Sequence, residues 1–329
     1  MGNHKISSLF LVCAAGAAIF FGLSGARGFS APATGTPEVM RSFPADCQFV
    51  FGVDVQRIVA SPSYRQLKQL VVGKQAPSFE TKRRSVVEAV GLDYERDIDH
   101  VYGAGCGAPD EDAGDGGALA VVSGRLDRKA ITDAILRRPR LTEKERGGHR
   151  IFTVTIGEGD AALKKSVVFL SDRELAVGDL AALENLLDVR ERKKPGLLTD
   201  PKMAALLPTV DYGAMAWFAG DAAMAIRNSP LKSPLEQPGL NAANSIESVT
   251  GTLDFAEAFR LNVSATAVDA VAAEQLTGAA QVLLDIVRAG AAETPQMKTL
   301  LAGFDMSRQG ERITLSLDCP LDVIEQLVK

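Results

Sequence analysis

The sequence predicts an α+β protein with mainly antiparallel sheets, made of two ferredoxin-like βαββαβ halves behind an N-terminal signal or anchor segment. Two observations carry the prediction of the fold. Several segments alternate apolar and polar residues, which is typical of strands with one wet face and favours antiparallel over fully buried parallel sheet. The order strand, helix, strand, strand, helix, strand occurs twice along the chain, as in a duplicated ferredoxin-like unit.

The N-terminal segment has the composition of an export sequence. Residues 6–26 follow Lys5 and contain no charged residue, and small residues lie around Ala26 and Gly28. A basic start, an apolar stretch and small residues near a cleavage site are typical of a secretory signal peptide. About 20 uncharged residues also suffice for an uncleaved membrane anchor. We therefore assign residues 1–33 to a signal peptide, or to an anchor with its linker that associates with a membrane through residues 6–26. In either case we expect an extracytoplasmic protein, periplasmic or secreted.

The first α+β half is expected over residues 44–194. Its strands are apolar runs, and its helices carry apolar residues at helical spacing or follow a capping residue such as Asp127. We expect strands at residues 47–54, 98–104, 118–124, 150–156, 166–170 and 175–178. We expect helices at residues 55–72, 81–90, 128–137 and 180–189.

The second half is expected over residues 195–329, after the charged segment 190–196. Here the alternation is clearest, because residues 249–255, 261–267 and 313–319 each place an apolar side chain at every second position. A further strand is expected at residues 214–219. A long helix with apolar 3.6-residue spacing is expected at residues 268–289, and short helices at residues 201–207 and at the C-terminus.

Composition excludes several classes of protein. The 329 residues are 46% hydrophobic and 23% charged, which is the range of globular domains. The formal net charge of −5 argues against a nucleic-acid partner, since such binding depends on neutralising phosphates. Four cysteines are too few for a disulfide-dense scaffold, and no CxxC or zinc-type Cys/His spacing occurs. We expect no cofactor and no thiolate metal site.

Three cysteines lie beyond the export segment: Cys47, Cys106 and Cys319. In an oxidising compartment an odd number permits one disulfide and one free thiol. In a ferredoxin-like unit the first strand starts at the end of the sheet where the fourth strand finishes. Cys47 begins the first expected strand and Cys319 ends the last, so a Cys47–Cys319 bridge is the pairing we expect if one forms, with Cys106 free. The alternative is three buried apolar side chains.

An acidic loop follows the strand that ends near Cys106. Asp110, Asp112 and Asp115 are candidate calcium ligands in this loop. They do not match an EF-hand, because Asp115 occupies the position of the required glycine and no glutamate follows at the twelfth position. The glycines at 103, 105 and 107 do not open a helix, which argues against a phosphate loop. A flexible hairpin loop without a metal is therefore the favoured interpretation.

One histidine is a candidate for catalysis. His100 lies beside Asp97 and Asp99, and a carboxylate can orient an imidazole as a general base. The chain has no GxSxG or HExxH motif, and no serine partner for His100 is indicated. A hydrolase with a His/Asp site in the cleft between the halves is thus the alternative hypothesis, beside a strand histidine without catalytic role.

Short motifs resemble a group of exported bacterial proteins of unknown function. They are residues 43–46 (FPAD), 49–54 (FVFGVD), 61–62 (SP), 97–99 (DID) and 171–179 (SDRELAVGD). The resemblance implies export and a duplicated α+β build, and it implies no activity. Together with the residues, it favours a non-enzymatic binding or scaffolding protein of the bacterial cell envelope. Its partner would be an envelope protein or a ligand of unknown kind.

Overall fold

The computed structural model describes residues 35–64, 92–107, 117–156, 163–222, 245–256, 258–290 and 295–328. One twelve-stranded sheet runs through these residues in the order β11-β12-β10-β9-β8-β1-β2-β3-β7-β6-β5-β4, and every pair of neighbours is antiparallel. The strands are β1 (Cys47–Asp54), β2 (Ile98–Cys106), β3 (Gly117–Gly124), β4 (Leu141–Arg146), β5 (His149–Ile156), β6 (Leu163–Phe169), β7 (Glu174–Gly178), β8 (Ala216–Asp221), β9 (Ile246–Asp254), β10 (Ala258–Ala267), β11 (Phe304–Gln309) and β12 (Arg312–Pro320).

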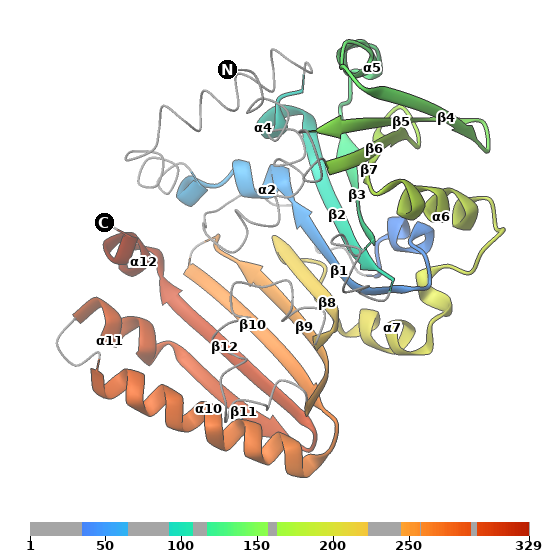
Figure 1. The fold of residues 1–329 in the computed structure, drawn as a ribbon. Helices are drawn as coiled ribbons and strands as arrows, with labels where there is room; N and C mark the ends of the chain where they lie inside the picture. The colour runs from blue at the N-terminus through green and yellow to red at the C-terminus, as the bar shows by residue number, and fades with distance from the viewer. Residues whose placement is uncertain are drawn as a thin grey trace.

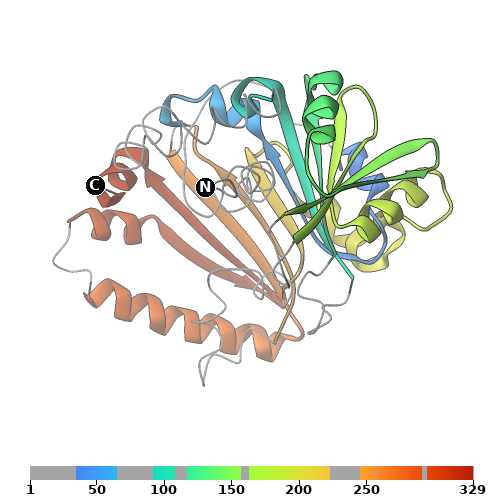
Figure 2. The same cartoon turned by 45° about the horizontal axis from the view of Figure 1, so that its top comes forward.

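Helices lie at both ends of this sheet. Figures 1 and 2 show α10 running along β11 at one end, whereas α5, α6 and α7 gather around the strands at the other end. The α-helices are α2 (Val55–Val59), α4 (Tyr94–Asp97), α5 (Arg128–Leu136), α6 (Leu180–Arg190), α7 (Pro201–Leu206), α10 (Ala270–Gly290), α11 (Pro295–Ala302) and α12 (Leu321–Val328). The 3-10 helices are η1 (Glu38–Ser42), η3 (Leu197–Thr199) and η4 (Leu207–Thr209).

Aspartate caps explain where several helices begin. The Asp127 side chain accepts a hydrogen bond from the Ala130 N–H at 2.9 Å, and the Asp200 side chain accepts one from the Met203 N–H at 2.8 Å. Each bond satisfies one of the N–H groups that the first helical turn leaves without a partner. The expected cap at Asp127 is therefore confirmed.

The N-terminal part of the sheet, from β1 to β7, is packed on both faces. One cluster joins Val50, Leu119 and Val121 to α6 through Leu183 and Leu186. A second cluster on the opposite face joins Val101, Ala120 and Val122 to α5 through Ile131 and Ile135. Successive residues of β3 point to opposite faces, so its continuous apolar run is explained by burial on both sides.

The predicted antiparallel sheet with mixed helix and strand content is confirmed, but the two ferredoxin-like halves are not. In a split βαβ unit the first two strands are parallel and another strand lies between them. Here β1 and β2 are direct neighbours and antiparallel, with Val50 opposite Ala104. The expected boundary near residue 194 falls after α6, and β8 then continues the same sheet by pairing with β1.

Two strands were not expected from the sequence, and they are the two edges of the sheet. β4 and β11 occupy the ends of the strand order. The expected continuous helix at 55–72 is wrong in its first part: α2 ends at Val59, and Ala60 and Ser61 are not helical, since Pro62 disfavours helical backbone at the residue before it. The rest of that helix beyond residue 64, and the expected helix at 81–90, lie outside the described ranges. Within the described residues no helix has the length and apolarity needed to cross a membrane, and the export segment lies outside them.

Candidate functional site

The structure does not bring His100, Asp97 and Asp99 together. Asp97 is buried at the end of α4, where its carboxylate accepts hydrogen bonds from the Asp93 N–H at 2.9 Å and from Arg96 at 2.8 Å. Asp99 follows in β2 and pairs with Arg173 at 2.9 Å. Asp99 is the extra residue of a register shift between Ile98 and His100 in the pairing of β2 with β3. Both aspartates therefore have structural partners away from His100.

His100 instead lies beside Asp54 and Tyr102. Its Nε2 is 3.9 Å from Oδ2 of Asp54, the residue opposite it in β1. Its ring is stacked on Tyr102, with 5.8 Å between the ring centroids. Burial, and secondarily the charge of Asp54, raises the pKa of Tyr102 to about 12. A phenol with so high a pKa stays protonated at neutral pH and can serve only as a hydrogen-bond donor or acceptor.

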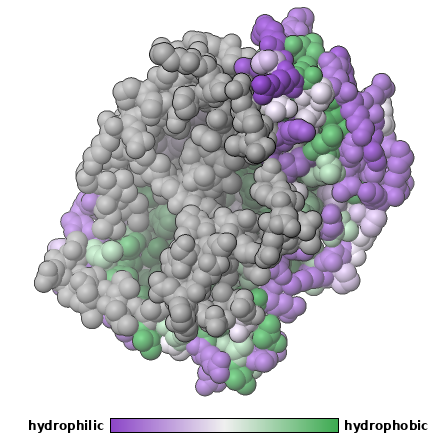
Figure 3. Space-filling view, in the orientation of Figure 1, coloured by the Kyte–Doolittle hydropathy of each residue, from purple (hydrophilic) through white to green (hydrophobic). Residues whose placement is uncertain are grey.

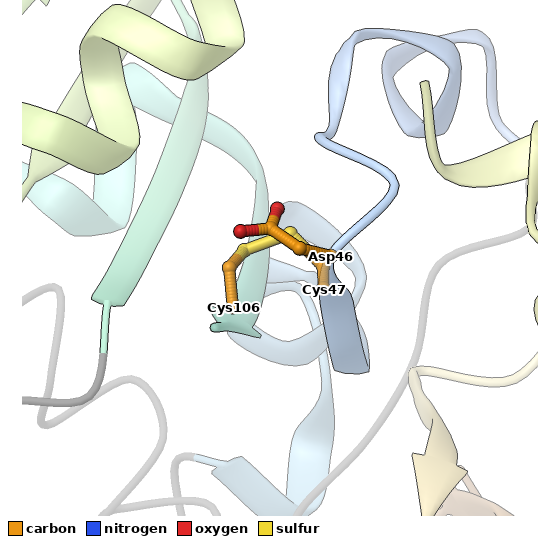
Figure 4. Close-up of side chains that lie close together, drawn as sticks. All are labelled: Asp46, Cys47 and Cys106. Carbon is orange, nitrogen blue, oxygen red and sulfur yellow. A yellow bond between two sulfur atoms is a disulfide. The ribbon is translucent and has the colours of Figure 1, made fainter. Parts of the chain in front are cut away.

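The expected Cys47–Cys319 pairing is wrong. Cys47 forms a disulfide with Cys106, as Figure 4 shows, and Cys319 is a buried free thiol. The physical reason is the topology: β1 and β2 are neighbours, and Cys47 lies directly opposite Cys106 in their register. Cys319 ends β12, which pairs with β10 and β11 and is separated from β1 by three strands. Burial, with Asp322 and Asp318 nearby, raises the pKa of the Cys319 thiol.

Asp46 is the only further potential ligand beside this bridge among the described residues. Its carboxylate and the two sulfur atoms lie within 4.8 Å of one another (Figure 4). A disulfide has no thiolate to offer, and the thiolate is the metal-binding form of cysteine. With Cys47 and Cys106 oxidised, their bridge is therefore a structural cross-link and not a metal site. The expected calcium candidates Asp110, Asp112 and Asp115 lie outside the described residues.

The most distinctive surface of the molecule lies on one face of its C-terminal strands, and we call it the apolar face. Residues directly opposite each other in neighbouring strands share a face, so the registers define three rows of side chains. The central row runs from β8 to β11 through Phe218, Gly251, Val263, Leu315 and Met306. The flanking rows are Leu253, Leu261, Leu317 and Phe304 on one side, and Val249, Ala265, Ile313 and Arg308 on the other.

Both ends of the apolar face are covered, and its middle is not fully buried. At one end Ala272, Ala273 and Leu276 of α10 pack with Ala267 and Ile313. At the other end a cluster of Met215, Leu253 and Phe255 packs with Leu261 and with Leu321 of α12. Val263 and Leu315 lie between these clusters and are partly exposed. In Figure 3 hydrophobic residues are visible on this side of the molecule, whereas the side formed by α5, α6, β4 and β5 is mainly hydrophilic.

The central row begins at β8 with an aromatic side chain, Phe218. The ring of Phe218 lies over Gly251 of the next strand, where a Cβ atom would clash with it, and Phe218 stacks on Phe49 at 5.9 Å between centroids. Phe218 and Phe49 are both partly exposed. Five strands spaced by about 4.8 Å make this row about 19 Å long. It carries no charged or hydrogen-bonding side chain from Phe218 to Met306.

The opposite face of β9, β10 and β12 is polar, whereas β8 places Trp217 and Ala219 on it. It presents hydroxyl and amide side chains in matching rows, among them Thr250, Thr252, Asn262, Ser264, Thr314 and Ser316. The alternation of the sequence therefore predicted correctly which residues of β9, β10 and β12 share the apolar face, whereas it did not identify Phe218 of β8 or Phe304 and Met306 of β11. What it did not reveal is that the middle of this face is left partly exposed, because that depends on where α10 and α12 pack.

Comparisons with known proteins add a structural likeness only. No family model and no curated protein matches the chain. Crystal form I of TP0453 is similar to it with a TM-score of 0.45 and 11% sequence identity, covering 89% of this chain and 97% of that chain. Crystal form IV of TP0453 gives a TM-score of 0.44, 9% identity and the same coverage of both chains. A likeness at this level assigns neither a fold family nor a function.

Proposed function

We propose that this protein is a binding protein of the bacterial cell envelope, and that its ligand is the hydrocarbon chain of an amphiphile held on the apolar face. The observation that carries the proposal is the partly exposed pair of Val263 and Leu315 in the central row, between two covered ends. Ligand sites are mostly apolar and are largely formed before the ligand binds. A row of this kind on a hydrogen-bonded sheet meets both conditions.

The chemistry of the face favours a hydrocarbon chain over a peptide or a sugar. A peptide or sugar has polar groups that need hydrogen-bond partners when they leave water. The central row offers none, because its members are Phe218, Gly251, Val263, Leu315 and Met306, and the backbone groups of β8, β9, β10 and β12 are used by strand neighbours on both sides. A hydrocarbon chain leaves no such group unsatisfied, and its burial is favourable at about 25 cal/mol per Å².

Export rests on the N-terminal segment and on the disulfide. The basic start and uncharged run of residues 6–26 support secretion through the inner membrane. The Cys47–Cys106 bridge supports an oxidising compartment, since stable disulfides are rare in the cytosol. Fractionation of cells that express the full chain tests this part. We expect the protein in the envelope or periplasm with its two cysteines oxidised; a cytoplasmic protein with reduced cysteines would contradict it.

The binding experiment uses two substitutions on one strand. Val263→Asp places a carboxylate in the central row, whereas Ser264→Asp places it on the polar face one residue away. Titration with a fluorescent long-chain fatty acid should give saturable binding to the wild type, at least tenfold weaker binding to Val263→Asp, and little change for Ser264→Asp. Circular dichroism melts of all three proteins check that they fold. Equal affinity for both variants, or no binding by the wild type, would refute the proposal.

A further inference from the structure

The two edges of the sheet differ in how they would meet a second copy of the chain. An edge strand has a row of backbone N–H and C=O groups without a strand partner, and charged side chains there oppose further pairing. Among the described residues, β4 and β11 are the only strands with one neighbour each. The groups that point outward can be derived for both strands, because bonded and outward positions alternate along an antiparallel strand.

The β4 edge opposes pairing with itself. The Thr155 N–H donates to the Arg140 carbonyl, so in the same register residues 142, 144 and 146 bond to β5 and residues 141, 143 and 145 point their backbone groups outward. Pairing two copies with full overlap of these positions would bring Glu143 directly opposite its own copy. Like charges opposite each other in neighbouring strands are destabilising.

The β11 edge has the opposite character. The Asp318 N–H donates to the Gly303 carbonyl at 2.9 Å, so Asp305 and Ser307 are the positions that bond to β12. Phe304, Met306 and Arg308 then point their N–H and C=O groups outward. In antiparallel pairing of two copies, only registers that place outward positions opposite each other form hydrogen bonds.

One register satisfies all three outward positions. With the two-fold axis at Met306, Met306 lies opposite its own copy and Phe304 lies opposite Arg308 of the second copy, which places a guanidinium beside an aromatic ring. Asp305 then lies opposite Ser307, whose hydroxyl can donate a hydrogen bond to the Asp305 carboxylate. Shifting the axis to Asp305 would place two aspartates opposite each other, and shifting it to Ser307 would leave Phe304 without a partner.

Among the described residues, helix α10 runs beside β11 without pairing with its edge (Figure 1). It packs over the apolar face, where Ala272 and Leu276 contact the sheet, and is not the next element in the plane of the strands. Glu274 of α10 lies 3.7 Å from Arg308, and Arg288 donates to the Phe304 carbonyl at 3.4 Å. A carbonyl oxygen has two lone pairs, so Phe304 can keep this bond and accept another from a second copy.

We propose that two copies of this chain associate through antiparallel pairing of β11 with β11 about a two-fold axis at Met306. The surface is self-complementary, as a two-fold interface requires. The association uses backbone groups of the edge strand. Met306 also belongs to the central row of the apolar face, but Val263 and Leu315, which carry the proposed ligand site, lie on β10 and β12 and not on the edge strand.

Light scattering of the wild type and of edge variants tests the dimer. The purified protein should have twice the mass of one copy, which is 34.9 kDa when the N-terminal segment is retained. Met306→Pro should give a monomer, because proline removes the outward N–H on which the pairing depends. Its melting temperature should fall modestly, because the Met306 side chain is lost from the cluster with α10. Met306→Leu, the matched control, should remain a dimer. A monomeric wild type at high micromolar concentration, or a dimeric Met306→Pro protein, would overturn the proposal.

Cysteine cross-linking tests the register separately. Directly opposite residues have Cα atoms about 5.5 Å apart, which is within the range of a disulfide. Met306→Cys should therefore form a covalent dimer under mild oxidation. Ser307→Cys should not, because two Ser307 residues are offset from each other along the strands in this register. If neither variant forms a covalent dimer, or if only Ser307→Cys does, the dimer has another interface and this proposal is refuted.

Discussion

The two parts of the single sheet use their faces differently. In the N-terminal part both faces are closed: Val121 and Val122 are successive residues of β3, and both are at most 2% exposed. In the C-terminal part Val263 and Ser264 are successive residues of β10, and both are partly exposed. The sequences reflect this, since β3 is a continuous apolar run and β10 alternates apolar and polar residues.

This difference indicates that the N-terminal part of the sheet contributes most of the stability, whereas the C-terminal part has the apolar area available for binding. Helices on both faces of β1, β2, β3 and β7 complete a core of the kind that supplies most of a domain's stability. The C-terminal strands have a polar face, on which Asn262 is exposed whereas Ser248 and Thr250 are buried, and an apolar face covered at its ends. Apolar area that the fold leaves accessible contributes little to folding and remains available to a ligand.

The largest expected effect compares one leucine from each part. Leu186 of α6 is fully buried, so Leu186→Ala should lower the free energy of unfolding by about 3–5 kcal/mol, through lost burial and a cavity. Leu315→Ala removes the same atoms from a partly exposed position and should cost about 1.5–2 kcal/mol. Urea unfolding of both variants measures the costs. Equal costs would show that the apolar face is as well packed as the N-terminal core, and would break the comparison.

Removal of the disulfide measures how much the cross-link adds to the stability of the N-terminal part of the sheet, beyond the packing of its two faces. The bridge joins residues separated by 59 positions, so replacing both Cys47 and Cys106 by alanine should cost about 2–4 kcal/mol, chiefly by freeing the unfolded chain. Denaturant unfolding with and without a reductant measures it. The control is Cys319→Ala, whose response to reductant should equal that of the wild type. A wild type whose stability does not change on reduction would contradict the assigned pairing.

A smaller effect concerns the buried acid of the closed part. Asp188 at the end of α6 is 4% exposed and accepts hydrogen bonds from Arg146 at 2.8 and 2.9 Å. These bonds hold the pKa of the Asp188 carboxyl below its usual value. Asp188→Asn should therefore cost about 1.5–3 kcal/mol at neutral pH, as for other hydrogen bonds to charged groups. The exposed pair of Lys129 and Asp133 on α5 provides the control, since Asp133→Asn should leave the stability nearly unchanged.

The pH dependence of the Asp188 effect has a defined sign. Because the folded pKa is lowered, the stabilisation is fully present above the unfolded carboxyl pKa of about 3.9 and is lost as the pH falls through the folded value. The difference in unfolding free energy between wild type and Asp188→Asn should thus be constant from about pH 5 to 7 and shrink below about pH 4. A difference that persists unchanged at low pH would show that Asp188 acts through its shape and not its charge.

Strands with a strong apolar pattern were predictable, and the edges were not. The expected strands at 47–54, 249–255, 261–267 and 313–319 lie within or nearly coincide with β1, β9, β10 and β12. β4 was missed because Leu141 is its only apolar residue, although the turn at Gly147 and Gly148 after it is a hairpin signal. β11 was also missed, although Gly310 in the turn after it is a hairpin signal; its φ of 61° is in the left-handed region that favours glycine. An edge strand needs fewer apolar residues because one of its sides meets no other strand.

The candidate site was predictable only in its parts. The residues of the apolar face on β9, β10 and β12 were recognised as one side of amphipathic strands, whereas the disulfide was assigned to the wrong partner and His100 to aspartates that bond elsewhere. Each of these errors concerns which strands are neighbours. Sequence spacing restricts the direction of a side chain within its own strand, but it contains little information on which distant strand lies beside it.

The sequence by itself determined the secondary structure of most of the described chain, the division of the C-terminal strands into an apolar and a polar face, and the expectation of export. These depend on local patterns of two and 3.6 residues and on a short N-terminal composition. Only the tertiary structure decided that one continuous sheet joins both parts, that Cys47 meets Cys106, and that α10 and α12 leave Val263 and Leu315 partly exposed. The reason is that strand order and helix placement minimise the free energy of the whole chain, to which contacts between distant segments contribute most.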